Sequence, residues 1–93
     1  MRFELAEEEA IARSAATICR IAAEGTHWRV LVETWEEGGE YRGRFIFEPE
    51  GVGQFFEVRQ GPPMLHGRSR EEVLAAAHEL PEQRLRVLLH SLA

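Results

Sequence analysis

Two β-rich segments joined by a short glycine-containing turn constrain the fold of this chain more than any other feature. Residues 27–35 and 41–48 are rich in β-branched and aromatic side chains, and residues 36–40 between them read Glu-Glu-Gly-Gly-Glu. Paired glycines supply the positive φ angles that tight hairpin turns require. A second turn at residues 49–53 leads to a shorter β-rich segment at residues 54–59. Two tight turns in succession predict a three-stranded antiparallel meander.

Segments with helical periodicity flank the predicted sheet. Residues 5–24 place their apolar side chains on one arc of a helical wheel, and Gly25 suits the position that ends a helix. Residues 60–68 contain consecutive prolines and predict a loop. Ser69, with Glu72 three residues later, has the capping-box pattern that begins a helix. Pro81 suits the first turn of another helix, in which leucines recur with helical spacing over residues 82–92.

The predicted order of elements is therefore α-β-β-β-α-α. This order describes an α+β fold, a three-stranded antiparallel meander with an N-terminal helix and two C-terminal helices. A chain of 93 residues can bury enough surface for one core. Since no repeat or low-complexity tract divides the sequence, residues 1–93 are expected to form a single α+β domain.

Composition indicates the class of protein and its compartment. Hydrophobic residues make up 44% of the chain and charged residues 29%, which is typical of a soluble globular domain. The first residues are acidic, and no apolar run approaches the roughly 20 residues that a membrane span requires. The single cysteine, Cys19, has no partner for an internal disulfide. We therefore expect a cytoplasmic protein without membrane contact, and the use of arginine without lysine favours a bacterial source.

The residue types that are missing restrict the possible chemistry. All 11 basic residues are arginine and all 16 acidic residues are glutamate, so the chain contains no lysine, aspartate or asparagine. Lysine Schiff bases, aspartate nucleophiles and aspartate-containing triads are excluded. Cys19 is expected to be a buried, unreactive thiol. His27, His66, His78 and His90 stand apart in the sequence, without metal-ligand spacing. We predict no catalytic, cofactor-binding or metal-binding residues; an enzyme would need some of these histidines to meet glutamates in a cleft.

Alternation along the predicted strands divides their side chains between two faces. The first face is predicted to be the core and holds Trp28, Val30, Val32, Tyr41, Gly43, Phe45, Phe47, Phe56 and Val58. The second face mixes apolar side chains with charges of both signs, and it holds Arg29, Leu31, Glu33, Trp35, Arg42, Arg44, Ile46, Glu48, Phe55, Glu57 and Arg59. An apolar patch with a charged rim is typical of an interaction surface.

The second face supplies the candidate interaction residues. They are the apolar side chains Leu31, Trp35, Ile46 and Phe55, with Arg42, Arg44 and Glu33 as the rim. Three interpretations are open: the C-terminal helices cover this face, a homodimer forms through the face or through an edge strand, or a different protein partner binds. Single-stranded nucleic acid could stack on such a face, but the interleaved glutamates and a net charge of −5 argue against it.

The segment Gly-Arg-Ser-Arg-Glu-Glu-Val-Leu-Ala-Ala-Ala at residues 67–77, which follows the predicted meander, resembles the start of the helix in HicB-type antitoxins. The resemblance covers about half of the chain, and it implies a small protein that binds and blocks another protein. The N-terminal helix and the two closing helices predicted here depart from that pattern. The sequence thus predicts a non-catalytic protein–protein interaction module that self-associates through its sheet. The alternative is an antitoxin-like or other regulatory protein that binds a protein partner or, less favourably, single-stranded nucleic acid.

Overall fold

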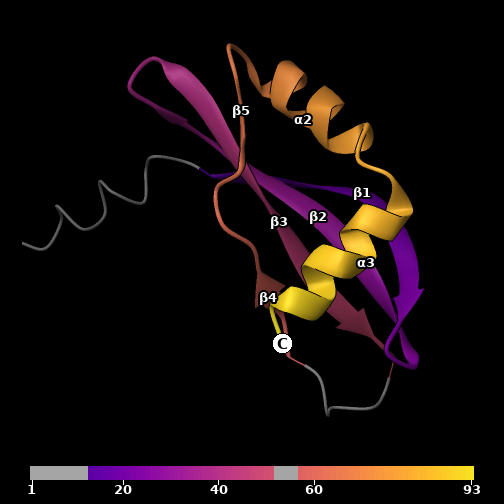
Figure 1. Ribbon diagram of the computed structural model, residues 1–93. Coiled ribbons are helices and arrows are strands. Elements are labelled where there is room, and N and C mark those ends of the chain that lie inside the picture. Colours follow the sequence, from indigo (N-terminus) through magenta and orange to yellow (C-terminus); the bar gives the residue numbers. More distant parts are fainter. Residues whose placement is uncertain (1–12, 52–56) are drawn as a thin grey trace, which may run out of the picture.

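The computed structural model describes residues 13–51 and 57–93, which form an antiparallel sheet followed by two helices (Figure 1). The three long strands are β1 (Ser14–Ala23), β2 (Thr26–Glu37) and β3 (Glu40–Glu50). The short strands β4 (Arg59–Gln60) and β5 (Leu65–Gly67) both pair with β3, and the sheet order is β1-β2-β3-β4. The helices are α2 (Arg70–His78) and α3 (Glu82–Ser91).

The predicted N-terminal helix is wrong where the structure describes it. Residues 14–23 form β1, which pairs with β2 from end to end apart from a β-bulge between Thr17 and Cys19. The first part of the predicted helix lies outside the described residues. The alanines of this segment fit one face of a helix, but they fit a strand beside β2 equally well. Glu24 and Gly25, with φ angles of 53° and 77°, form a two-residue hairpin turn where a helix end was predicted.

The predicted meander and the following loop also need correction. The hairpin of β2 and β3 is confirmed, with Gly38 and Gly39 at positive φ in its turn. In place of a third strand at residues 54–59, the described residues hold only the two-residue β4, and residues 52–56 lie outside the description. The predicted loop at residues 60–68 contains β5. The central strands of the sheet are therefore β2 and β3, with β1 at one edge and β4 and β5 at the other.

The two C-terminal helices are confirmed. The hydroxyl oxygen of Ser69 accepts a hydrogen bond from the Glu72 N–H at 3.1 Å, so the predicted cap begins α2. The Glu72 carboxylate in turn accepts a bond from the N–H of Arg68 at 2.8 Å. Pro81 precedes the first residue of α3, where its missing N–H leaves no hydrogen bond unmade.

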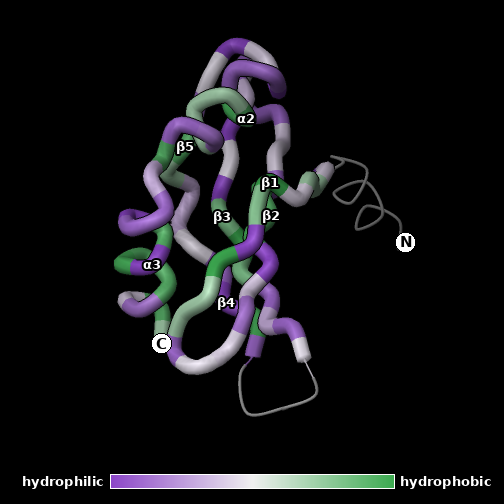
Figure 2. The backbone as a smooth tube through the Cα atoms, turned by 90° about the vertical axis from the view of Figure 1, so that its right-hand side faces the viewer, coloured by the Kyte–Doolittle hydropathy of each residue, from purple (hydrophilic) through white to green (hydrophobic). Residues whose placement is uncertain are grey.

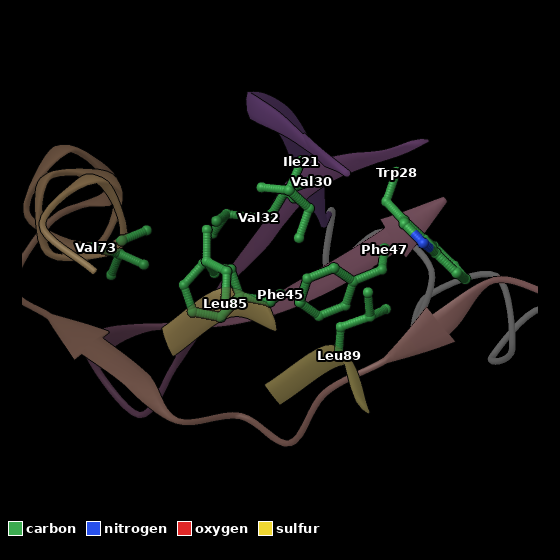
Figure 3. Close-up of a cluster of buried hydrophobic side chains, with 10 residues drawn as sticks. Ile21, Trp28, Val30, Val32, Phe45, Phe47, Val73, Leu85 and Leu89 are labelled. Carbon is green, nitrogen blue, oxygen red and sulfur yellow. The ribbon is translucent and has the colours of Figure 1, made fainter. Parts of the chain in front are cut away.

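Both helices pack on the same face of the sheet (Figure 2). Their buried side chains meet the aromatic and β-branched side chains of β2 and β3, as Figure 3 shows. This core comprises Ile21, Trp28, Val30, Val32, Phe45, Phe47, Val73, Ala77, Leu85 and Leu89. The division of β2 and β3 into two faces by alternation is therefore confirmed for the core side. None of the helices within the described residues is long and apolar enough to cross a membrane.

Helix α2 approaches the sheet closely at Gly43. A Cβ atom added there would lie 2.6 Å from Cγ1 of Val73 and 3.3 Å from the backbone oxygen of Glu33. Val73 is fully buried and its branched side chain has little rotational freedom, so it cannot easily move away. The missing side chain of Gly43 therefore sets how closely α2 lies on the sheet.

We expect Gly43→Ala to destabilise the protein by about 1–3 kcal/mol, because the added methyl overpacks the contact with Val73. Urea unfolding followed by circular dichroism measures the effect. The matched test is the double variant Gly43→Ala/Val73→Ala, in which the smaller side chain makes room. Its destabilisation should fall short of the sum of the two single effects by about 0.5 kcal/mol or more. Strict additivity would show that the methyl added at position 43 is accommodated elsewhere.

Candidate interaction surface

The sheet face opposite α2 and α3, here called the open face, holds six of the seven candidate interaction residues. The register of β2 and β3 places them directly across from one another in three pairs, which are Leu31 with Ile46, Glu33 with Arg44, and Trp35 with Arg42. Phe55, the seventh candidate, lies outside the described residues. Neither α2 nor α3 lies over this face.

The centre of the open face is apolar and its flanks are charged. Leu31 and Ile46 are partly buried beside each other. On one side Arg44 Nε donates to Glu33 Oε1 at 2.7 Å, and on the other side Arg29 Nε donates to Glu48 Oε1 at 3.1 Å. Ion pairs of this kind contribute little to stability. Their importance here is that opposite charges alternate, so the face has little net charge around its apolar centre.

Trp35 is covered by side chains of its own chain. The Arg13 guanidinium lies 4.4 Å from the centroid of the Trp35 ring, and the Arg44 guanidinium lies 5.9 Å from it. The indole Nε1 donates to Glu37 Oε1 at 3.0 Å. The residue is consequently only 8% exposed. Among the described side chains, the apolar centre of this face is therefore the pair Leu31 and Ile46, and Trp35 lies beyond the Glu33–Arg44 pair.

Near β4, two residues do not lie on the face of the sheet that the predicted alternation assigns to them. Arg59 pairs with Phe47 and so lies on the core side, where the sequence places it on the second face. Val58, predicted for the core, is 51% exposed. The prediction applies strict alternation to a strand at residues 54–59, whereas β4 begins only at Arg59. The open face thus loses one of the four arginines considered for nucleic-acid stacking.

Arg59 instead belongs to a charged cluster at one end of the core. Its Nη2 donates to Glu24 Oε1 at 2.9 Å, its Nη1 donates to the backbone oxygen of Leu89 at 3.0 Å, and its guanidinium lies 4.7 Å from the Trp28 ring centroid. Nδ1 of His90 lies 3.1 Å from Glu24 Oε2. The cluster joins the β1–β2 turn, β4 and the end of α3.

Hydrogen bonds from Arg59, and then from His90, lower the pKa of the Glu24 carboxyl. A carboxylate held in this way is a weak base at neutral pH. The cluster of glutamate, arginine and histidine is therefore suited to fastening three segments together.

The remaining candidate groups for chemistry lie apart. The four histidines lie on β2, β5, α2 and α3 respectively, and the described residues contain no group of three or more metal-ligating side chains. Cys19 is partly buried on β1 and lines a cavity of about 190 Å³ between that strand and the α2–α3 junction. Burial, and to a lesser degree Glu82, raises the pKa of the Cys19 thiol. The thiol is thus protonated at neutral pH and is a poor nucleophile.

Comparisons of the chain with protein-family models, with curated proteins and with solved structures gave no match in any of the three. The resemblance of residues 67–77 to HicB-type antitoxins gains no support from them.

The cluster around Glu24 predicts a dependence of stability on pH. Because the pKa of Glu24 is lower in the folded protein, the unfolded chain binds more protons, and stability rises with pH. The contribution of Glu24 is complete above the ordinary glutamate pKa of about 4.3 and is lost as the pH falls through the lower pKa of the folded state.

Thermal unfolding of the wild type and of Glu24→Gln at a series of pH values measures this contribution. We expect the wild type to have the higher melting temperature at pH 6, and the difference to shrink steadily below the ordinary glutamate pKa. A difference that stays constant down to pH 3 would assign it to something other than the charge of Glu24.

Proposed function

We propose that this protein is a non-catalytic protein–protein interaction module that self-associates by packing its open face against the open face of a second copy. The observation that supports this proposal is the apolar pair of Leu31 and Ile46, at the centre of a sheet face that neither described helix covers. Burying that pair against its counterpart removes apolar surface from water, which is the main driving force of association.

The charges of the open face suit a contact between identical surfaces. The chain has a net charge of −5, so two copies repel each other at long range. On the open face itself, Glu33 and Glu48 are matched by Arg44 and Arg29. A two-fold axis brings the same patch of both copies together, and alternating charges allow the glutamates of one copy to approach the arginines of the other.

The ion pairs on the open face also weaken the alternative of nucleic-acid binding. Phosphate contacts need arginines whose charge is not already compensated. Arg13, Arg29 and Arg44 on or beside the open face each lie within 3.5 Å of a glutamate oxygen, and Arg42 is the exception, since no described carboxylate pairs with it. An apolar centre whose flanking ion pairs are neutral favours a protein surface as the partner.

Light scattering after size exclusion tests the proposal. We expect the wild type to be heavier than the 10.6 kDa of one chain at micromolar concentration, and Leu31→Glu to reduce that mass by half. The reason is that the variant would bury two unpaired carboxylates at the centre of the contact.

The matched control is Val87→Glu, because Val87 is 62% exposed on α3, on the other side of the molecule. It adds the same charge to an apolar surface position and should leave the mass unchanged. Circular dichroism of both variants verifies that they fold. A wild type of one-chain mass, or equal masses for the two variants, would rule out the open face as the contact.

A further inference from the structure

We propose a second self-contact that the face packing does not use: the outer edge of β1 pairs, antiparallel, with the same edge of another copy. Two sheets would then join into one continuous sheet about a two-fold axis. This contact goes beyond the proposed function, since it depends on backbone groups at the sheet edge and not on the side chains of the open face.

The two edges of the sheet differ. On the β3 side the edge is occupied by the short strands β4 and β5, separated by Gly61, Pro62, Pro63 and Met64. Short edge strands and prolines are devices that prevent further pairing. On the other side β1 presents ten residues, and no described segment pairs with its outer side.

The hairpin turn determines which backbone groups of β1 face outward. In a two-residue hairpin the flanking residues bond to each other, here Ala23 and Thr26, and bonded and non-bonded pairs then alternate. Counting along β2, Leu31 and Glu33 fall in non-bonded pairs. Their partners on β1, Thr17 and Ala15, therefore direct their N–H and C=O groups away from β2.

As far as the described residues go, the free part of this edge is its N-terminal half. At the other end the backbone oxygen of Ala22, which also faces outward, already accepts a hydrogen bond from Arg86 Nε at 2.9 Å. The β-bulge between Thr17 and Cys19 interrupts the regular strand. Residues 14–17 thus form a regular stretch with outward-facing donors and acceptors, bounded on one side by the bulge.

Unpaired donors and acceptors in a row are complementary to another strand. The side chains of residues 14–17 favour a second copy of the same strand. This stretch reads Ser-Ala-Ala-Thr, so it holds neither charge nor proline, two devices that keep edge strands from pairing. About a two-fold axis this stretch opposes itself in antiparallel orientation, and no like charges meet within it.

Edge pairing and face packing are compatible. The two-fold axis of a continuous sheet runs perpendicular to the sheet, so both open faces lie side by side on one surface. The axis of face packing lies parallel to the sheet. The two axes meet when the face axis runs across the strands, over Leu31 and its β1 partner Thr17. Two perpendicular two-fold axes that intersect generate a closed assembly of four copies, and for this arrangement we expect a tetramer when both contacts form.

The test blocks the outward N–H of residue 17 without removing a bond between β1 and β2. Thr17→Pro does this, since proline is tolerated at an edge strand when its nitrogen faces outward. The matched control Thr17→Val changes the side chain and keeps the N–H. Light scattering is expected to show half the wild-type mass for Thr17→Pro, the wild-type mass for Thr17→Val, and a single chain for Thr17→Pro combined with Leu31→Glu.

The outcomes separate the two contacts. If Thr17→Pro keeps the wild-type mass while Leu31→Glu halves it, the edge proposal is overturned and the face contact stands. If Thr17→Pro reduces the mass and Leu31→Glu does not, the edge contact stands and the face contact fails. A wild type of one-chain mass overturns both, and a foreign partner then becomes the occupant to seek.

Hydrogen exchange supplies a measurement that does not depend on a variant. The amides of Ala15 and Thr17 should exchange slowly at concentrations where the protein assembles, and should exchange faster on dilution. Rapid exchange of both amides at every concentration would overturn edge pairing even if Thr17→Pro failed to fold.

Discussion

The packing of two short helices on one face of the sheet is the interaction on which the rest of this structure depends. Val73 and Ala77 from α2, with Leu85 and Leu89 from α3, cover the side chains of Trp28, Val30, Val32, Phe45 and Phe47. Helices of nine and ten residues are too short to be stable alone, so this burial is what holds them helical. Because both pack on the same side, neither described helix covers the opposite face.

The charged cluster at Glu24 links the sheet to α3 at one end of the core. Glu24 has a φ angle of 53°, which is unusual for a residue with a side chain. The hairpin turn requires this backbone conformation. From that turn its carboxylate reaches Arg59, which also bonds to a carbonyl of α3 and lies over Trp28. One arginine therefore links the turn, the short strand β4 and the last helix.

Local signals predicted the parts of the fold that depend on neighbours in sequence. The glycines of the β2–β3 turn, the alternation along both strands and the Ser69 cap each act within a few residues, and each was predicted correctly. The strand at residues 14–23 was predicted wrongly, as a helix, because small side chains such as Ala15, Ala16 and Ala22 suit a helix and a strand alike. Pairing with β2 decides between the two, and that contact is long-range. For the same reason the sequence could not show that Arg13 covers Trp35.

The misassigned segment changes what the open face can do. An N-terminal helix would pack on one face of the sheet, and the predicted meander left open which face that is. As β1, the segment widens the sheet, adds Ala15 and Thr17 to the surface beside Leu31, and supplies an edge with outward-facing backbone groups. Side-chain contacts on the face and backbone contacts at the edge are different kinds of interaction, and neither uses the groups of the other. The two proposed contacts would therefore extend an assembly in two perpendicular directions.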